Sequence, residues 1–457
     1  MTDFPGAIPR HGLMTDLYQL TMAAGYFDAG KTKERATFEL FARRLPHNRN
    51  FILAAGLEQA VEYLLNFHLT ADEILYLRTL PQFKYVSAAF FDMLAGLRFT
   101  GDLFAVPEGT PLFAGEPFLT VRAPVIEAQI PETYLLATVG FQSSIATKAA
   151  RVVKAAMGAD VVEFGSRRAQ SPEAGVYAGR AAYIGGCVGT SNVEAGFRYR
   201  AHVFGTAAHS WVMSFASERQ AFEQLQKLFG ERTTYLIDTY DTLAGAQLAA
   251  GLGRPLWGVR LDSGNLVNLV PAVRKILDDA GLRDAKIMAT GDLNEHKIHE
   301  LVAAKMPIDV YGVGTDLATS SDAPSLGVVY KMVELEDSSG RRFTAKFSNE
   351  KHTLPGAKQI FRYADHDVIG RSTECLECGP GDAAVEALQR PVILGGKLVE
   401  PLPAIGQIRK SAAQRLARLP APCHSLFQAK DAWRVELSAE LKHLDESVRE
   451  SVVGTPA

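Results

Sequence analysis

VVEFGSRR at residues 161–168 is the first of three short apolar runs that each close in a small polar turn. The second and third are IGGCVGTSN at 184–192 and AHVFGTAAHS at 201–210. Short apolar runs that end in Gly-Ser or Gly-Thr are typical of buried strands whose carboxyl ends open onto a site. Cations, hydroxyls and an imidazole follow these strand ends, at Arg167, Arg168, Ser191, Asn192, His209 and Ser210. This grouping predicts an anionic, phosphorylated substrate.

The same pattern continues outward as a longer region of alternating strands and helices. Between residue 160 and about 333 the expected strands are VVEF, CVGT, HVFGT, TTYLIDTYD, WGVRLDSG, KIMATGD, DVYGVGTD and GVVYKMVE. Regular alternation with polar residues at the strand ends indicates an α/β fold, either a parallel barrel or a doubly wound sheet. The absence of a single Gly-rich switch point favours the barrel. Because the region is short for eight regular units, we expect an irregular parallel α/β barrel.

The chain length of 457 residues indicates more than one domain, since one hydrophobic core usually holds no more than about 250–300 residues. Residues 1–130 mix helices and strands without strict alternation, which predicts an N-terminal α+β domain. A long helix opens at Pro131 and leads into the barrel domain, expected over 131–334. Beyond it we expect a β-rich stretch and helices at 381–389 and 427–450. This C-terminal segment, 335–457, is predicted to pack back on the N-terminal domain and make that domain discontinuous.

Composition and charge exclude several classes of partner. The formal net charge of -3 and the pI of about 6.4 leave no basic footprint for nucleic acid. No apolar run approaches the roughly 18 residues of a membrane span, and no basic segment leads into an apolar run at the N-terminus, so we expect a cytoplasmic protein. Cys375 and Cys378 form a CxxC that Cys423 and His424 could complete as a metal set, although unligated thiols explain the same residues.

The later strand ends carry residues suited to a phosphorylated sugar. Gly291-Asp292 and Gly314-Thr315 could point backbone N–H groups at a phosphate, although both pairs also suit simple tight turns. Carboxylates stand at or near three strand ends, at Asp238, Asp241, Asp262 and Asp292. Such groups hold Mg²⁺, grip ribose hydroxyls or stabilise a developing cation, whereas Asp241 also suits a helix N-cap.

Two further residues admit more than one interpretation from sequence alone. His209 could be a packed or capping histidine, or it could carry a phosphoryl group stabilised by a helix N-terminus. Arg260 lies in the apolar run GVRLDSG, and a buried arginine needs an anion. A Schiff-base aldolase would need a lysine at a mid-barrel strand end, for which Lys331 is the only near candidate. The residues alone therefore predict a phosphate-handling barrel enzyme.

The motifs EFGSRRAQ, GTSN, FGTAAHS, GVRLDSGNL, ATGDLN and YGVGTDL, preceded by TDLYQLTM and FELFARRLP, resemble those of nicotinate phosphoribosyltransferase. They run in order from about residue 14 to 334. The resemblance implies a type II phosphoribosyltransferase fold and the condensation of nicotinate with phosphoribosyl pyrophosphate to nicotinate mononucleotide and pyrophosphate, in NAD biosynthesis. It also implies coupling to ATP hydrolysis through a phosphohistidine, a requirement for Mg²⁺, and a head-to-tail homodimer whose sites lie between subunits.

The resemblance also implies catalytic roles for residues in the matching motifs. His209 matches the histidine that ATP phosphorylates, and Asp238 would orient it. Asp262 would hold ribose or, through the substrate, Mg²⁺. The 5′-phosphate and ribose would contact Gly291, Asp292, Gly314 and Thr315, while Arg43 would contact pyrophosphate.

The same resemblance implies a site for the pyridine ring. The ring would lie between Phe164 and Tyr18 of the partner subunit, with Arg167 and Arg260 facing its carboxylate and the adjoining phosphates. The similar nicotinamide-using enzyme has an acidic residue at the position of Ser191, and a carboxylate there would repel nicotinate. Ser191 therefore favours nicotinate over nicotinamide. The alternatives are a nicotinamide phosphoribosyltransferase, a catalytically silent NAD-metabolite binding protein and an unrelated barrel aldolase.

Overall fold

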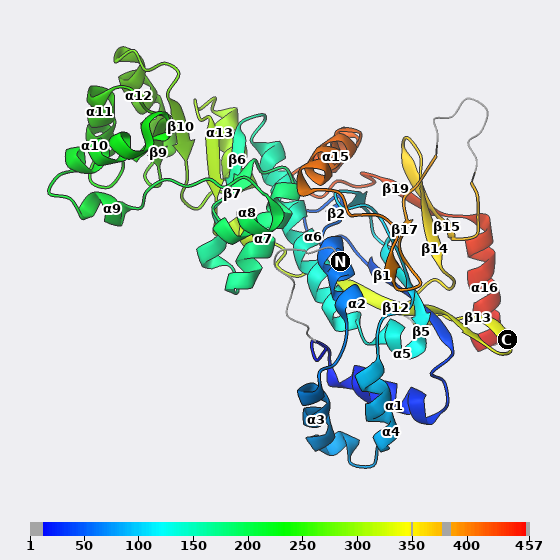
Figure 1. The fold of residues 1–457 in the computed structure, drawn as a ribbon. Coiled ribbons are helices and arrows are strands. Elements are labelled where there is room, and N and C mark those ends of the chain that lie inside the picture. The colour runs from blue at the N-terminus through cyan, green and yellow to red at the C-terminus, as the bar shows by residue number, and fades with distance from the viewer. Residues whose placement is uncertain (1–11, 349–350, 377–384, 454–457) are drawn as a thin grey trace. The chain divides into compact units, whose positions relative to one another are not determined.

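The computed structural model describes residues 12–348, 351–376 and 385–453 of the chain. The chain divides into two compact units (Figure 1). The first unit comprises Met1–Ser143, Ser325–Pro403 and Gln414–Ala457, and the second comprises Ser144–Pro324 and Ala404–Ala413. The first division falls inside α6 (Glu132–Ala155), the long helix that was expected to open at Pro131.

A seven-stranded antiparallel sheet is the main sheet of the first unit. Its strand order is β13-β12-β1-β5-β3-β17-β18. The early strands are β1 (Arg35–Ala42), β3 (Asp102–Ala105) and β5 (Pro117–Pro124), and the late ones are β12 (Val328–Asp337), β13 (Gly340–Phe343), β17 (Arg390–Leu394) and β18 (Lys397–Leu398). β1 pairs with β5 on one side and with β12 on the other, and β17 of the C-terminal segment pairs with β3, so late parts of the chain complete the sheet of the N-terminal region.

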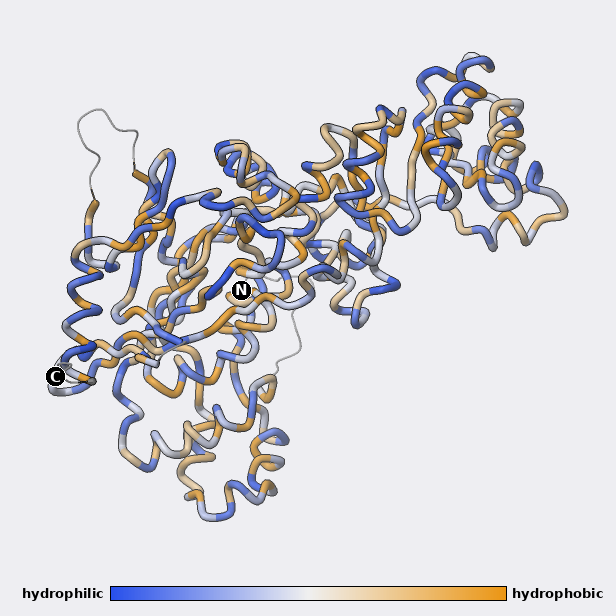
Figure 2. Tube along the Cα trace, turned by 180° about the vertical axis from the view of Figure 1, so that it is seen from behind, coloured by the Kyte–Doolittle hydropathy of each residue, from blue (hydrophilic) through white to orange (hydrophobic). Residues whose placement is uncertain are grey.

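Smaller sheets and helices complete the first unit. A four-stranded sheet has the order β16-β14-β15-β19, and β2 pairs with β4. These strands are β2 (Ile52–Leu53), β4 (Pro111–Leu112), β14 (Lys358–Arg362), β15 (His366–Arg371), β16 (Glu386–Ala387) and β19 (Arg434–Leu437). The helices are α1 (Leu17–Asp28), α2 (Leu57–Asn66), α3 (Ala71–Thr79), α4 (Ala88–Gly96), α5 (Val125–Gln129) and α16 (Ala439–Val453). Figure 2 shows α16 as mostly hydrophilic, with only a narrow buried side that includes Leu441 and Val448.

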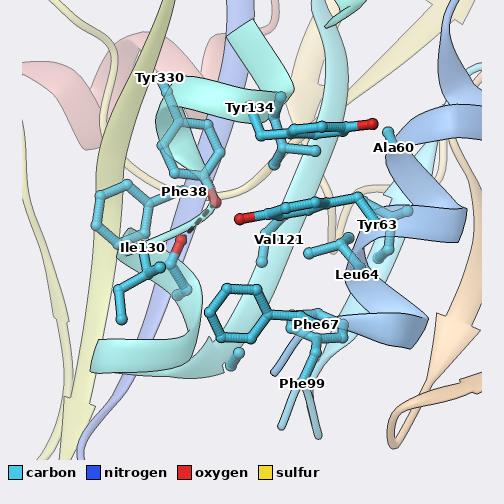
Figure 3. Packing of buried hydrophobic residues seen from close by; sticks show 14 of the residues in the cluster. Phe38, Ala60, Tyr63, Leu64, Phe67, Phe99, Val121, Ile130, Tyr134 and Tyr330 are labelled. Atoms are coloured by element: carbon cyan, nitrogen blue, oxygen red, sulfur yellow. Dashed lines mark hydrogen bonds between the residues drawn. The ribbon is translucent and has the colours of Figure 1, made fainter. Parts of the chain in front are cut away.

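Aromatic rings pack the core of this unit beneath the sheet (Figure 3). Phe38 of β1 and Tyr330 of β12 stack with their ring centroids 4.9 Å apart. Tyr63 and Tyr134 stack at 3.9 Å, and the Tyr330 hydroxyl donates to the Ala128 carbonyl at 2.7 Å. Because a buried aromatic ring removes about 150–250 Å² from water, these contacts are a large part of what holds the early and late strands together.

A buried ion pair joins the same distant segments. Lys358 Nζ of β14 lies 2.8 Å from Glu39 Oε2 of β1, and the Lys358 backbone N–H donates to Glu39 Oε1 at 2.7 Å. Both side chains are almost completely buried. Burial raises the pKa of Glu39 and Lys358 opposes that rise. Removing the lysine would therefore leave a desolvated carboxylate with little compensation.

Replacement of this lysine should destabilise the first unit. We expect Lys358→Met to lower the free energy of unfolding by about 3–5 kcal/mol, the usual cost of an unpaired buried charge. Without Lys358 to oppose the effect of burial, the folded-state pKa of Glu39 should be higher in the variant than in the unmodified protein. The variant therefore loses more stability as pH rises, and the loss should be smaller at pH 5 than at pH 8. Denaturant unfolding at both pH values measures this loss. The control Lys31→Met, in the more exposed pair with Glu34, should cost no more than about 1 kcal/mol.

The second unit contains a six-stranded parallel sheet with the order β7-β6-β11-β10-β9-β8. The strands are β6 (Asp160–Glu163), β7 (Gly189–Thr190), β8 (Thr234–Leu236), β9 (Gly258–Leu261), β10 (Lys286–Ala289) and β11 (Val310–Val313). The helices are α7 (Pro172–Ile184), α8 (Val193–Tyr199), α9 (His209–Met213), α10 (Glu218–Phe229), α11 (Thr242–Leu252), α12 (Leu266–Asp279), α13 (Glu295–Ala303) and α14 (Thr315–Ala318). The predicted α/β class is confirmed.

Two predicted barrel strands have different roles in the structure. HVFGT forms no strand but a single parallel bridge between Thr190 and Val203. GVVYKMVE forms β12 in the antiparallel sheet of the first unit, where its apolar residues find β1 rather than a parallel neighbour. Lys331 consequently pairs with Glu39 across that sheet and does not stand at a barrel strand end, where a Schiff-base aldolase would need its lysine.

The C-terminal segment also differs from its prediction. The helix predicted over 427–450 is in fact β19 followed by α16, because RVEL at 434–437 pairs in parallel with β15. Of the helix predicted over 381–389, the described part contains the strand β16. The sequence also missed α15 (Ile405–Ala417). Cys375 is exposed, and Cys378 lies outside the described residues. In the described ranges no helix is long and apolar enough to cross a membrane.

Candidate active site

The carboxyl ends of the six parallel strands meet at one edge of the sheet, and most of the candidate residues follow them. In the spatial order of the strands, the residues just beyond these ends are Ser191, Phe164, Gly314, Gly291, Asp262 and Asp238. Parallel strands direct their carboxyl ends to the same side, so residues far apart in sequence become neighbours there. Tyr18 and Arg43 belong to the first unit, on α1 and after β1.

His209 is the first residue of the five-residue helix α9, and its ring contacts two other strand ends. The Nδ1 atom lies 3.1 Å from the Thr239 hydroxyl, and Nε2 lies 3.9 Å from Asp262 Oδ2. The ring is about two-fifths exposed, so its position does not come from core packing. A helix of one short turn has only a small dipole, and the hydroxyl and carboxylate are therefore the main influences on this ring.

Asp238 links the ends of two neighbouring strands. Its Oδ2 accepts from the backbone N–H of Asp262 at 3.0 Å and from the Ser263 hydroxyl at 2.6 Å. Its Oδ1 is buried without a hydrogen-bond partner among the described residues. The ring of His209 thus contacts Thr239, the residue after Asp238, while Asp238 holds the turn that carries Asp262.

Arg260 projects from β9 toward the same edge and is half-buried. Its guanidinium donates to the Ala207 carbonyl at 3.2 Å, whereas its buried Nε has no hydrogen-bond partner among the described residues. Burial lowers the pKa of Arg260, Asp262 and Asp238 raise it, and Arg167 lowers it further. The two guanidinium groups are thus close enough to repel each other. A buried guanidinium with a free donor and a second cation in its surroundings favour an anionic ligand at this edge.

The ring of Phe164 lies against β11 where that strand has a glycine. A Cβ atom at Gly312 would lie 2.8 Å from Phe164 Cδ2 and 2.5 Å from Thr290 Cγ2. The Phe164 backbone N–H donates to the Val313 carbonyl at 2.8 Å, which extends the pairing of β6 with β11. Gly312 therefore gives Phe164 the space for its ring.

The two glycine turns at later strand ends are close to each other. Gly291 has φ +90°, and a Cβ there would lie 2.0 Å from the Asp262 carbonyl oxygen, so no other residue fits. Asp292 also has a positive φ of 47°. Asn294 Nδ2 donates to Asp316 Oδ2 at 3.0 Å and so joins this turn to the one that carries Gly314 and Thr315. The pair of turns forms one surface of backbone groups and small residues.

The first unit has a cationic cavity of about 760 Å³. It is lined by Phe41, Arg43, Arg44, Gly115, His352, Thr353, Leu354 and Lys358. Arg43 Nε is buried without a hydrogen-bond partner among the described residues. Because Lys358 is paired with Glu39, Arg43 and Arg44 are the cations of this lining that would bind an anion. On α1, Tyr18 is about half exposed.

The chain matches known protein families and structures over most of its length. A family model described as the nicotinate phosphoribosyltransferase (NAPRTase) N-terminal domain matches residues 13–140. The model of the nicotinate phosphoribosyltransferase (NAPRTase) family matches residues 159–338. The chain belongs to the nicotinate phosphoribosyltransferase family.

Individual relatives agree with this membership. The nicotinate phosphoribosyltransferase pncB2 of Mycobacterium tuberculosis is 43% identical over 460 residues, with 96% of both chains covered. That of Bacillus subtilis is 44% identical over 360 residues, which cover 77% of this chain and 72% of the relative. The crystal structure of human nicotinic acid phosphoribosyltransferase superposes with a TM-score of 0.83 at 31% identity and covers 95% of this chain and 100% of the human one.

Three residues that contact or line the candidate groups described above were not singled out from the sequence. Thr239 contacts His209, and its only sequence signal is its place in the polar run DTYD after a strand. Glu163 is fully buried beneath the edge where Phe164 and Ser191 lie. In the sequence it is a single charged residue within an apolar run, and this is the only signal that could have indicated it. His352 lines the cationic cavity through a segment predicted only as β-rich and basic.

The resemblance implies that Phe164 stacks on the base, so filling the space beside its ring should weaken binding of the base. We expect Gly312→Ala to displace the Phe164 ring, because overpacking typically costs about 1–3 kcal/mol, and to raise the KM for nicotinate by roughly tenfold. Steady-state kinetics with nicotinate as the varied substrate measure the change. The control Gly251→Ala, on α11 with open space around its Cβ position, should leave the KM unaltered. Equal kinetics for both variants would contradict the role of Gly312.

Proposed function

We propose that this chain is a nicotinate phosphoribosyltransferase that condenses nicotinate with 5-phosphoribosyl 1-pyrophosphate to nicotinate mononucleotide and pyrophosphate, in NAD biosynthesis. Its relatives carry this enzyme name over 96% of the chain. The observation that carries the proposal is the pair Arg167 and Arg260 at the same sheet edge as the His209–Asp262 contact. An anionic base, an anionic leaving group and a developing cation would each find the opposite charge there.

The charges at this edge suit the chemistry of glycosyl transfer. Displacement of pyrophosphate from the anomeric carbon gives an oxocarbenium-like transition state, and nearby carboxylates stabilise its positive charge. Asp262 would serve this purpose and hold ribose, while Asp238 fixes the Asp262 backbone. Phe164 would stack on the pyridine ring, with Arg167 and Arg260 facing the nicotinate carboxylate. The turns at Gly291, Asp292, Gly314 and Thr315 would bind the ribose 5′-phosphate through backbone N–H groups.

ATP coupling is part of the proposal and would involve His209. The ring nitrogen attacks the γ-phosphorus of ATP, which releases ADP and gives a phosphohistidine whose phosphoryl group water later removes as phosphate. The sum is nicotinate, phosphoribosyl pyrophosphate, ATP and water going to nicotinate mononucleotide, pyrophosphate, ADP and phosphate. Thr239 and Asp262, which contact the two ring nitrogens, support a defined tautomer for this step.

Mg²⁺ would be held through Asp262 together with substrate phosphates. Among the described residues no group of three or more His, Cys, Asp and Glu side chains is arranged to hold a metal ion. A hard cation held by one or two carboxylates and by phosphate oxygens fits this donor set. Mg²⁺ supplies charge neutralisation on the pyrophosphate leaving group when bound. The unpartnered Oδ1 of Asp238 is a further oxygen donor at the same edge.

The proposed assembly is a cytoplasmic homodimer with sites shared between subunits. The support is the family resemblance, which implies that Tyr18 of the partner subunit covers the pyridine ring and that Arg43 contacts pyrophosphate. The exposed ring of Tyr18 and the cationic cavity around Arg43 are chemically suited to these contacts. Sedimentation or light scattering would show one species of about twice 49.6 kDa.

The decisive test of the activity is a product assay. Purified protein with phosphoribosyl pyrophosphate and Mg²⁺ should form nicotinate mononucleotide, followed by chromatography, and ATP should stimulate that formation. His209→Ala should abolish the stimulation because no nitrogen is left to carry the phosphoryl group. The control His299→Ala, an exposed histidine on α13, should keep it. Absence of product with either base would favour a catalytically silent NAD-metabolite binding protein.

Base selectivity gives a second test. Ser191→Asp should raise the KM for nicotinate by at least about tenfold, since a like charge in a partly desolvated site costs more than about 1 kcal/mol. It should also give turnover of nicotinamide, whose amide can donate to the new carboxylate. Ser191→Asn, neutral and of similar size, controls for bulk. Product mainly from nicotinamide in the unmodified protein would show that Ser191 does not set selectivity and that the enzyme is a nicotinamide phosphoribosyltransferase.

A further inference from the structure

Glu163 is a buried carboxyl group with no role in the chemistry described so far. It is the last residue of β6 and is fully buried. Its described hydrogen-bond partners are a hydroxyl and a backbone amide rather than a cation. Desolvation by burial raises its pKa, and these two hydrogen bonds lower it. Burial of a carboxyl group costs free energy of folding. A buried carboxyl group at a strand end of the candidate site is therefore expected to have a specific function.

The side-chain partners of Glu163 lie at the carboxyl ends of the neighbouring strands β6 and β7. Glu163 and Thr190 are register partners, the last residues of neighbouring parallel strands. The Thr190 hydroxyl donates to Glu163 Oε2 at 2.5 Å, and the Gly165 backbone N–H donates to Glu163 Oε1. The Ser191 backbone N–H donates to the Glu163 carbonyl at 2.8 Å. Glu163 therefore forms hydrogen bonds with the turn after β6 and with the turn after β7.

Further hydrogen bonds close this arrangement into a ring. The Asn192 backbone N–H donates to Thr190 Oγ1 at 3.0 Å, and Asn192 Nδ2 donates to Ser166 Oγ at 3.1 Å. Ser166 adjoins Gly165, so the bonds return to Glu163. Packing leaves little freedom here, because a Cβ at Gly165 would lie 2.9 Å from Glu163 Oε1 and 2.7 Å from the Gly314 carbonyl oxygen. The separation of the two turns is thus set by a closed set of bonds centred on Glu163.

These turns carry the residues that would contact the base. Phe164 and Arg167 stand on the turn after β6, and Ser191 stands on the turn after β7. We propose that Glu163 is a positioning residue for nicotinate, which acts through Thr190 and Gly165 to fix the distance between the turn that carries Phe164 and Arg167 and the turn that carries the selectivity residue Ser191. This rests on the proposed function, in which those three residues bind the base. Glu163 touches no substrate, since it is completely buried.

The inference predicts an effect on one substrate only. The contacts for the ribose 5′-phosphate lie on the turns after β10 and β11, which the ring of hydrogen bonds does not include. Loosening the ring should therefore raise the KM for nicotinate and leave the KM for phosphoribosyl pyrophosphate within about twofold. A merely structural role for Glu163 would weaken both substrates together, because the strand ends share one sheet.

Thr190→Val and Thr190→Ser form the matched pair that tests this inference. Valine keeps the shape of threonine but removes the hydroxyl that donates to Glu163 and accepts from Asn192, and we expect the KM for nicotinate to rise by about 5- to 50-fold. Serine keeps the hydroxyl and should restore a KM close to that of the unmodified protein. Thr233→Val, a buried threonine before β8, controls for the loss of a buried hydroxyl elsewhere in the unit.

Glu163→Gln and Glu163→Leu provide the second measurement. The glutamine amide can accept from Gly165 through its oxygen and donate to Thr190 through its nitrogen, so it should raise the KM for nicotinate much less than leucine does. Parallel steady-state kinetics in both substrates, with circular dichroism to verify folding, give the result. Unchanged nicotinate KM in folded Thr190→Val, or equal shifts in both KM values, would overturn the assignment while the unmodified enzyme remains active. If the unmodified protein makes no product from nicotinate, the proposed function falls and this assignment falls with it.

Discussion

A buried carboxyl group needs hydrogen-bond donors or a cation at fixed positions around it. Each unit of this protein contains a buried glutamate whose partners meet this requirement. Glu39 is matched by the side chain and backbone of Lys358, more than 300 residues away in sequence. Glu163 is matched by Thr190 and Gly165 with no cation. In both cases the cost of an unsatisfied carboxylate forces distant segments into one arrangement. The first glutamate secures a discontinuous domain, and the second secures two turns of the candidate site.

The candidate site separates its charges along the sheet edge. Phe164, Arg167 and Ser191 gather toward β6 and β7, while Asp238, Asp262 and His209 gather toward β8 and β9. Arg260 comes from β9 but interacts with Arg167 as well as with the two aspartates. The Arg260 guanidinium therefore interacts with residues of both the β6–β7 group and the β8–β9 group. A substrate pair that brings a carboxylate at one end and a developing cation at the other would match this distribution.

Much of this arrangement could be predicted from sequence. The wrong predictions concern segments whose structure is decided by residues far away in the chain. Strand-helix alternation and polar strand ends predicted the α/β class, because those patterns depend on residues close together in the chain. GVVYKMVE was assigned to the wrong sheet, since its apolar pattern suits either sheet and only the antiparallel register with β1 decides. RVEL at 434–437 alternates polar and apolar residues over too few positions to exclude a helix, and it forms β19 through its pairing with β15. Thr239 and Glu163 could not be recognised from sequence, because the residues that they contact lie far away in the chain or depend on the fold. The roles that the family resemblance implies for the site residues remain predictions.

The antiparallel pairing of β1 with β12 has a consequence for how the chain is made. Arg35 pairs with Glu336, so one edge of β1 has no partner until about 300 further residues have been synthesised. At about 5–20 residues per second this interval lasts roughly 15–60 s. The second unit, whose strands are all local to residues 160–313, can form its sheet within that time. During synthesis the β1–β5 pair therefore has an open strand edge, which can pair with another chain until β12 has been made.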